Sequence, residues 1–468
     1  MATEDNTPNQ LETDDDGGYG QSRVYTWLDD RLDLNDQFLG KAFPEDKYAS
    51  FLLGEVSLFS FVILVMTGTF LGLLYRPGAA ATEYTGAAAQ YAGTEVPVAF
   101  ASVLRITYDV PFGMFTRMVH HWAAFVFIAA IGLHMLRVFF SGAYRNPREL
   151  NWVVGATLLF ISLGEAVFGY ALPFDEYAST ATGIAFTIAG SIPYVGETLK
   201  LLIFGGEWPD NAAVILPRLF FFHTFLIPLI IGGLIAVHML LLVRQKHTEQ
   251  KGTRDSDEQH GVEENDQSRV VGVPLVPNQA AVTVVVFLGV LGVIALLAAF
   301  FPVQRLPIWG PNNPTSTPGS VAPDWYLMWV FGILKIVTFV PKTEFVGGVI
   351  APGIIATVLV LWPFIDYSDR EVHFTADPIR RPKQTAVGVA AITMVLILSI
   401  AGMNTGLVKF LALFGVETTS GGVLLPLQIL TVVVPVLWGL ITYVVLKRGV
   451  ERRDVEDPSE TAAEADAD

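Results

Sequence analysis

Four histidines in two long apolar stretches have the types and spacing of metal ligands. His120 and His134 lie 14 residues apart in 116–140, and the next pair, in 218–244, is His223 and His238, 15 residues apart. At about 100° and 1.5 Å per residue, 14 residues leave both side chains on roughly one helix face, about 21 Å apart along the axis. An ionisable side chain inside an apolar helix is costly and marks a functional site by default.

Two such helices packed antiparallel would supply two pairs of imidazoles. His120 would pair with His223 near one membrane surface. His134 would pair with His238 near the other, whereas His121 projects about 140° away from His134 and cannot share its face. Imidazole suits haem iron, and a bis-histidine pair leaves no open position, which favours electron transfer over oxygen binding. One buried histidine alone could equally be an ordinary core residue, but four in this arrangement predict two haems.

Glycines recur at the same interval in two other apolar stretches. Gly54 and Gly68 are 14 residues apart, and so are Gly155 and Gly169. A flat macrocycle wedged between helices needs a missing side chain where its edge meets a neighbouring backbone. The shared register predicts two stacked haem pockets in a four-helix bundle, although either pair alone could serve helix packing.

Arginines stand at or near the ends of the histidine stretches: Arg117, Arg137 and Arg218. Arginine there can extend its charged end to the membrane surface, and it can also bind the carboxylates of haem propionates. We expect the second role.

The tetrapeptide Pro323, Asp324, Trp325 and Tyr326 follows a loop rich in proline, glycine and asparagine. On the outer side of a membrane domain, the Asp324 carboxylate is a candidate proton acceptor. The alternative is an interfacial aromatic anchor with a solvated aspartate.

The composition is that of a polytopic membrane protein. Of the 468 residues, 52% are hydrophobic. Apolar runs of about 20 residues, each long enough to cross a bilayer as a helix, cover 51–75, 116–140, 152–172, 218–243, 280–302, 345–365, 384–402 and 423–446. We therefore predict an all-α fold with about eight transmembrane helices.

Charge predicts the orientation and excludes several functions. Most of the 29 lysines and arginines fall in segments that are cytoplasmic if the N-terminus is inside, so both termini are expected in the cytoplasm, in the plasma membrane of a prokaryote. No cleavable signal is apparent in the polar first 50 residues. A chain without cysteine cannot form disulfides, thioether-linked haem or a cysteine-ligated iron–sulfur cluster. The net charge of −16 excludes a basic nucleic-acid surface and suggests a high-salt organism.

Charged and apolar segments divide the chain into five parts. They are an acidic tail with a surface helix (1–50), a four-helix dihaem domain (51–243), an acidic cytoplasmic linker (244–279), a C-terminal transmembrane domain (280–450) and a second acidic tail (451–468). The outer loop 173–217 is expected to form short surface helices.

These motifs resemble the cytochrome b subunit of the cytochrome bc complexes over about residues 25–400. The matching motifs are R-x-x-H-H-W…H-x-x-R at 117–137, GYALPFDE at 169–176, PRLFFFHTF…H at 217–238 and PDWY at 323–326. Four further features are similar to the chloroplast-type branch, which has a separate subunit IV. They are the 15-residue histidine spacing, NPREL at 146–150, PLVPNQ at 274–279 and PFID…RRP at 363–382. The chain thus resembles those two halves fused through the linker, with an eighth helix at 423–446.

The resemblance implies quinol oxidation at an outer site between GYALPFDE, which includes Tyr170, and PDWY. One electron would go to a Rieske iron–sulfur protein, and the other through an outer and then an inner non-covalent b-type haem to quinone at an inner site. Protons would be released outside and taken up inside. A homodimer in membrane lipid is also implied. The resemblance does not identify the quinone, which could be menaquinone. It also does not identify the later electron acceptor, which could be a cytochrome c, a copper protein or a respiratory reductase.

The sequence departs from the family pattern once at each quinone site. Asp324 stands where many members have glutamate, and Gln279 stands where the mitochondrial type has aspartate. One alternative function is a dihaem membrane anchor of another reductase or dehydrogenase, which would need neither PDWY nor the glycine register. Another is a transporter with a histidine proton relay, which would bind no haem.

Overall fold

The computed structural model describes residues 42–44, 52–245, 272–274, 279–303, 306–313, 321–368, 375 and 378–456. The predicted surface helix at 25–34 and most of the linker 244–279 lie outside these residues. Within them, eight helical segments are long and apolar enough to cross a membrane, which confirms the predicted all-α fold. Strands in this part of the chain are confined to two short antiparallel pairs, β1 (Ala42–Pro44) with β4 (Gly272–Pro274) and β2 (Ala81–Glu83) with β3 (Glu95–Pro97).

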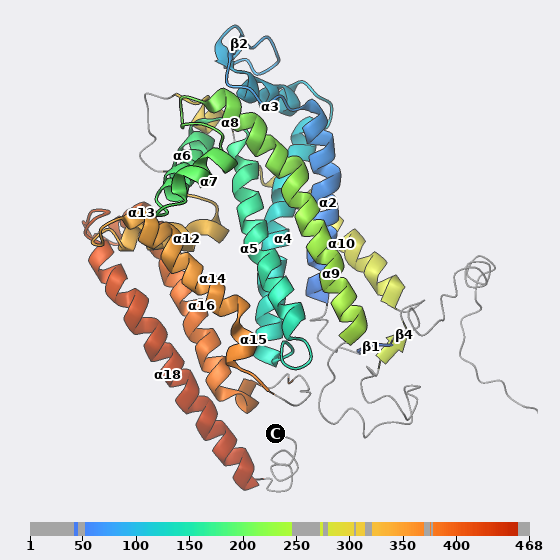
Figure 1. Ribbon diagram of the computed structural model, residues 1–468, viewed down its shortest axis with the longest axis vertical. Helices are drawn as coiled ribbons and strands as arrows, with labels where there is room; N and C mark the ends of the chain where they lie inside the picture. Colours follow the sequence, from blue (N-terminus) through green and yellow to red (C-terminus); the bar gives the residue numbers. More distant parts are fainter. Residues whose placement is uncertain are drawn as a thin grey trace, which may run out of the picture.

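Figure 1 shows the spanning helices running between two ends of the molecule. They are α2 (Leu52–Leu74), α4 (Gly113–Ser141), α5 (Glu149–Ala171), α8–η1–α9 (Ala212–Gln245), α10 (Ala280–Phe300), α13–η5–α14 (Thr343–Val360), α16 (Pro382–Gly402) and α18 (Leu424–Glu456). The shorter elements are α3 (Val98–Tyr108), α6 (Glu176–Gly190), α7 (Gly196–Ile203), α11 (Leu306–Trp309), η4 (Trp325–Leu327), α12 (Met328–Ile336), α15 (Trp362–Ile365), η6 (Pro378–Arg380) and α17 (Asn404–Ala412). We call the end that carries β2, α3, α6 and α7 the outer end, and the opposite one the inner end.

The N-terminal bundle consists of α2, α4, α5 and α9, with α2 packed along α4 and α5 along α9. Its centre is filled by Phe127, Ile128, Leu163 and Ile231, which are nearly inaccessible to solvent. At the inner end, the side-chain amide of Gln245 donates to the Pro147 carbonyl at 2.6 Å. The last turn of α9 is thereby tied to the loop before α5.

A π-helical turn, η1 (Phe222–Leu226), interrupts the fourth span between α8 and α9 and contains His223. A π turn accommodates one residue more than an α turn, and such turns occur frequently at functional sites. The extra residue accounts for the 15-residue spacing between His223 and His238, against 14 on α4. Both histidine pairs can therefore lie in the same register.

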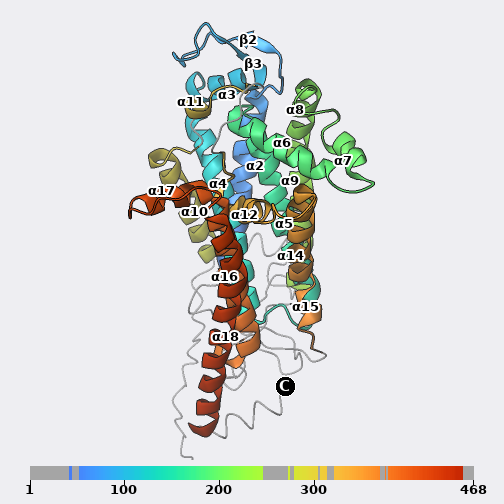
Figure 2. The ribbon, with the colours of Figure 1, turned by 90° about the vertical axis from the view of Figure 1, so that its left-hand side faces the viewer.

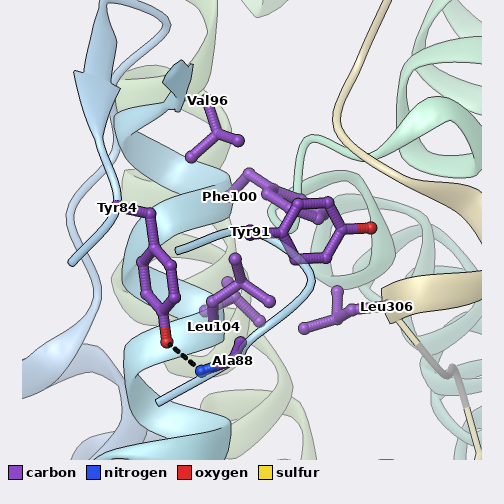
Figure 3. Close-up of a cluster of buried hydrophobic side chains, with 8 residues drawn as sticks. Tyr84, Ala88, Tyr91, Val96, Phe100, Leu104 and Leu306 are labelled. Atoms are coloured by element: carbon purple, nitrogen blue, oxygen red, sulfur yellow. Dashed lines mark hydrogen bonds between the residues drawn. The ribbon is translucent and has the colours of Figure 1, made fainter. Parts of the chain in front are cut away.

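The outer end carries a folded cap above the bundle. The β2–β3 hairpin and α3 enclose a hydrophobic cluster of Tyr84, Ala88, Tyr91, Val96, Phe100, Val103, Leu104 and Leu306 (Figure 3). Leu306 belongs to α11, so the cap also packs on the segment that leads from α10 toward PDWY. The predicted short surface helices in 173–217 are α6, α7 and the start of α8.

The C-terminal helices lie on two sides of the bundle, with α10 on one side and α12–α18 on the other (Figure 1). Helix α10 lies against α2 and α4, and α16 lies between α12 and the long α18 (Figures 1 and 2). The sixth span is shorter than the predicted run 345–365 because α14 ends at Val360 and Pro363, which lacks an N–H donor, lies in the first turn of the separate helix α15.

A polar cluster joins the two halves at the inner end, where Asp366 accepts hydrogen bonds from Tyr144 and from the buried Arg381. The Tyr144 hydroxyl in turn accepts from Trp362 Nε1 at 2.7 Å and from Arg381 at 2.8 Å. Burial acts to raise the pKa of Asp366, but the hydrogen bonds from Tyr144 and Gln384 and the charge of Arg381 outweigh it and hold that pKa below its usual value. The carboxylate is therefore the stable form in this cluster.

Candidate functional site

The four histidines come together in two pairs, one at each end of the bundle. The rings of His120 on α4 and His223 on η1 have centroids 6.0 Å apart and lie nearly perpendicular. The rings of His134 on α4 and His238 on α9 have centroids 6.4 Å apart in the same relative orientation. We call these the outer pair and the inner pair.

Both pairs have the separation that one metal ion between two imidazoles requires. Imidazole nitrogens bind a metal at roughly 2 Å, so two rings on opposite sides of one ion have centroids about 6 Å apart. The side chains also come from facing helices of one bundle, which is where bundles build cofactor sites.

The four predicted glycines each face one of the four histidines. A Cβ atom on Gly68 would lie 3.1 Å from His120 Cε1, and one on Gly169 only 2.6 Å from His223 Cε1. At the inner end, a Cβ on Gly54 would lie 3.5 Å from His134 Cε1 and one on Gly155 3.3 Å from His238 Cε1. Any side chain at these positions would occupy the space beside the imidazoles. The residues therefore fit two haem groups, each held between a histidine pair and two glycine backbones.

The Nδ1 atoms of the outer pair have defined neighbours. Thr67 Oγ1 donates its proton to the Ile63 carbonyl at 2.6 Å and lies 2.9 Å from His120 Nδ1, so it accepts the Nδ1–H. Glu165 Oε1 lies 2.7 Å from His223 Nδ1. The bond to Thr67 occupies Nδ1 of His120 and leaves Nε2 as the metal-binding nitrogen of that ring. The carboxyl of Glu165 lies beside Nδ1 of His223, so Nε2 is the nitrogen left for metal in that ring as well.

The three predicted arginines lie in different surroundings. Arg117 is on the first turns of α4, three residues before His120, and interacts electrostatically with Asp175. Arg137 is three residues beyond His134 on the same helix. Arg218 is exposed on α8, and its Nη1 donates to the carbonyls of Leu201 and Leu202 at 2.9 and 3.1 Å. The propionate role stays a prediction for all three.

Asp324 is a mostly buried carboxyl at the outer end. Its Oδ2 accepts a hydrogen bond from the Tyr326 hydroxyl at 3.1 Å and lies 3.9 Å from His121 Nε2, with 18% of the side chain exposed. Burial raises the pKa of Asp324 to about 6, against the smaller opposing effect of the Tyr326 hydrogen bond. The carboxyl can thus exchange a proton near neutral pH, which a general base requires.

Aromatic rings surround this carboxyl. Tyr326 packs against Phe125 of α4 with centroids 6.0 Å apart, and Trp325 packs on Tyr326 at 5.5 Å. Tyr170 at the end of α5 contacts Tyr177 of α6 at 5.7 Å, and both are nearly inaccessible. Pro323 precedes Asp324 at the start of the η4 turn. The three tyrosines are buried and limit the access of water to the carboxyl, whereas Trp325 is half exposed.

Backbone pairing joins GYALPFDE to residues 310–312, which precede PDWY in the chain. Phe174 and Glu176 of GYALPFDE exchange hydrogen bonds with the loop before PDWY: Asn312 N–H donates to Phe174 O at 3.1 Å and Glu176 N–H donates to Gly310 O at 3.3 Å. Between them, Asp175 forms an isolated bridge with Pro311. Asp324 itself interacts electrostatically with Tyr170 and Tyr177, so the residues predicted for one site lie close together although they are more than 130 residues apart in sequence.

Asp175 caps the helix that follows. It is 3% exposed, and its carboxylate accepts from the Ala178 N–H at 2.7 Å at the N-terminus of α6. Burial raises the pKa of Asp175 to about 6, although the bond from Ala178 and the charge of Arg117 act in the opposite direction. A cavity of about 620 Å³ opens beside α6, between it and α12–α13, lined by residues such as Ser179, Thr187, Phe331 and Glu344.

Sequence reasoning missed three polar residues near these sites. Glu165 and His121 were not assigned, although a carboxyl inside an apolar run and a histidine next to a predicted ligand are both visible signals. Glu55, beside Gly54, was also missed. Its Oε1 accepts from Gln279 and Thr283 of the α10 region at 2.7 and 3.1 Å. No pattern in the sequence indicates this last contact, because it joins two distant spans.

Two family models match the chain, one for each half. Residues 125–309 match "Cytochrome b(N-terminal)/b6/petB" and residues 311–419 match "Cytochrome b(C-terminal)/b6/petD". The chain is 34% identical to the cytochrome bc1 complex cytochrome b subunit of Mycobacterium leprae, over 86% of this chain and 72% of that protein. It is 35% identical to the subunit of the same name from Streptomyces coelicolor, over 86% of this chain and 74% of that protein.

A solved structure has the same fold. A chain of a hyperthermophilic respiratory Complex III superposes with a TM-score of 0.65 at 23% identity, covering 89% of this chain and 99% of that one. The predicted resemblance, including the fusion of the two halves, is confirmed by the two matched family models and the curated relatives. The chain therefore belongs to the cytochrome b family and is the cytochrome b subunit of a prokaryotic membrane complex of the bc1 type.

Proposed function

We propose that this chain is the quinol-oxidising, electron-bifurcating subunit of its complex, with two non-covalent b-type haems. The observation that carries this proposal is the placement of a buried proton acceptor, Asp324, at the same end of the bundle as the outer histidine pair. A dihaem anchor would need the two histidine pairs only. It would not need a mostly buried carboxyl beside the tyrosines of GYALPFDE and PDWY.

Each pair has a separate task. His120 and His223 hold the outer haem, and His134 and His238 hold the inner haem, with the four glycines leaving room for the macrocycles. The haems supply one-electron transfer across the membrane. A closed bis-histidine site excludes other ligands and keeps the chemistry to electron transfer.

Asp324 accepts a proton from the quinol hydroxyl at the outer site. The Tyr326 hydroxyl holds the carboxylate in position through its bond to Oδ2, and the buried rings of Tyr170 and Tyr326 limit the access of water. Carboxylate oxygens that point into a dry site are effective bases when their pKa is close to the working pH. Proton release on the outer side follows from this position.

Partners and the second quinone site complete the proposal. A Rieske iron–sulfur protein takes one electron at the outer end, the end at which the cavity between α6 and α12–α13 lies. The other electron reaches quinone at the inner end, where Glu55 Oε2 is buried and has no hydrogen-bond partner among the described residues. We further propose a homodimer with both termini in the cytoplasm, a high-salt organism, and menaquinone as one candidate quinone.

The first test is a pyridine-haemochrome assay combined with a potentiometric titration of the purified complex. Two b haems for each copy of this chain, at distinct potentials, are expected. Rapid mixing with a quinol analogue should then reduce haem in the wild type and much more slowly in Asp324→Asn. One haem or none would overturn the dihaem proposal. Equal reduction rates in the two proteins would leave the anchor function as the better description.

A further inference from the structure

A carboxyl group lies inside the membrane-spanning part of α5, next to an outer ligand. Glu165 is one helical turn before Gly169, and its Oε1 is 2.7 Å from His223 Nδ1. The carboxyl oxygen is thus in direct contact with the ring nitrogen, although the N–H is not aligned with it for a hydrogen bond in this ring orientation. The other oxygen, Oε2, is buried and has no hydrogen-bond partner in the described part of the chain. Burying an ionisable group in a membrane helix costs free energy, so its presence indicates a function.

The two ligands of the outer pair have chemically different neighbours. Beside His120 stands the neutral hydroxyl of Thr67, and beside His223 stands the carboxyl of Glu165. The side chains of His223 and Glu165 are only 18% and 15% exposed, so water screens their interaction weakly. At the inner end, the carboxyl of Glu55 is bound instead by Gln279 and Thr283.

An anionic neighbour changes what an imidazole ligand does to a metal. A carboxylate at the second ring nitrogen fixes the tautomer and raises the basicity of the ligand, and such partners matter to metal sites by factors of about 10 to 100. A more basic ligand and a nearby negative charge both favour the oxidised, more positive metal. The reduction potential of the site is therefore lowered.

We propose that Glu165 lowers the reduction potential of the outer haem through His223. The proposal rests on the proposed function, since it requires a haem at the outer pair. Glu165 acts through another residue and is thus a positioning residue. The membrane potential opposes movement of an electron from the outer to the inner side. A lower potential at the outer pair offsets that opposition.

The test is a redox titration, followed by visible absorption, of the whole complex carrying Glu165→Gln or Glu165→Asp. Glutamine keeps the size and loses the charge, whereas aspartate keeps the charge. We expect Glu165→Gln to raise the midpoint potential of the outer haem by about 59 mV or more, which is a tenfold change in the oxidised-to-reduced ratio of a one-electron couple. The inner haem should not change, and Glu165→Asp should stay closer to the wild type.

A carboxyl on the same helix provides the matched control. Glu149 is 16 residues from Glu165, about 24 Å along α5. Glu149→Gln should leave the potential of the outer haem unchanged. If it raised that potential as much as Glu165→Gln, a general charge effect would replace the specific one that we propose.

The outcomes separate the two proposals. If the wild type binds no haem at the outer pair, the proposed function fails. If both haems bind and Glu165→Gln leaves the outer potential unchanged, only the role of Glu165 fails. If Glu165→Gln does not retain haem, near-infrared magnetic circular dichroism of the oxidised wild type decides. A charge-transfer band displaced toward that of an imidazolate ligand supports the proposal, and coincident bands for the two haems overturn it.

Discussion

The outer and inner histidine pairs have the same arrangement of ligands and glycines but differ in how closely these residues approach one another. On α4 the two ligands are 14 residues apart, and so are the α2 glycines that face them and the α5 glycines that face His223 and His238. At the outer pair a Cβ on the glycines would come within 2.6 and 3.1 Å of an imidazole carbon, against 3.3 and 3.5 Å at the inner pair. The ring centroids are also closer at the outer pair, at 6.0 Å against 6.4 Å. The outer pocket is therefore the tighter of the two.

The surroundings of the pockets differ more than their frameworks. The outer pair lies at the end where Asp324, its aromatic rings and the cavity beside α6 gather, and Glu165 contacts one of its ligands. The inner pair lies near the Glu55–Gln279 contact. A repeated helix register can therefore hold two similar cofactors, while single polar residues give each end its own chemistry.

The largest expected effect is the loss of one haem without the other. His134→Ala removes a ligand from the inner pair, so we expect one haem for each chain in the pyridine-haemochrome assay, with the outer potential retained. His121→Ala is the control, since His121 is adjacent to a ligand in sequence but faces Asp324. Two haems in the His134→Ala protein would show that the inner pairing is wrong.

The difference in tightness predicts unequal costs of one methyl group. Gly169→Ala would place a Cβ 2.6 Å from His223 and should displace the ring and weaken or abolish binding of the outer haem, because overpacking costs about 1–3 kcal/mol. Gly54→Ala meets His134 at 3.5 Å, an ordinary contact, and should therefore weaken binding of the inner haem less than Gly169→Ala weakens binding of the outer haem. Haem content and the potentials of the two variants measure this. Equal behaviour of the two variants would remove the distinction between the pockets.

The outer site alone is expected to depend on a titrating carboxyl. Asp324→Asn should slow quinol oxidation by about 10²–10⁴, the range of general acid–base catalysis, with both haems bound. Because the proton acceptor is the deprotonated form and burial raises the pKa of Asp324 to about 6, the wild-type rate should rise as the pH increases through about 6. The asparagine variant should lose this rise, and Asp324→Glu should keep it. A wild-type rate that is flat from pH 5 to 7 would contradict the assignment.

The smallest expected effect concerns the inner-end cluster that joins the two halves. Tyr144→Phe removes the hydroxyl that donates to Asp366 and accepts from Trp362 and Arg381. Leaving buried donors unpaired costs about 1–3 kcal/mol, so thermal stability should fall while both haem potentials stay unchanged. A thermal denaturation series in detergent measures the change, with Tyr443→Phe on α18 as the control. A shift in the inner potential would instead connect this cluster to the inner pocket.

Much of the architecture could be predicted because membrane insertion depends on local properties. A run of about 20 apolar residues must become a helix in lipid, where every backbone group needs an internal partner. The periodicity of a helix then assigns His120 and His134 to one face, and Gly54 with Gly68 to another, without knowledge of their partners. The expected membrane spans and the pairs of residues in register follow from these two rules.

Contacts between distant segments were beyond such rules. Four features depend on how helices are placed against one another. They are the π turn at His223, the contact of Glu165 with that ring, the backbone pairing of Phe174 with Asn312 and the Asp366–Arg381 bond. Hydrophobic length and periodicity say which residues face the interior of the bundle, but they carry no information about the rotation and offset of one helix relative to the next. The amino-acid pattern thus accounts for the helices and the candidate ligands, whereas packing accounts for which carboxyl lies beside which histidine.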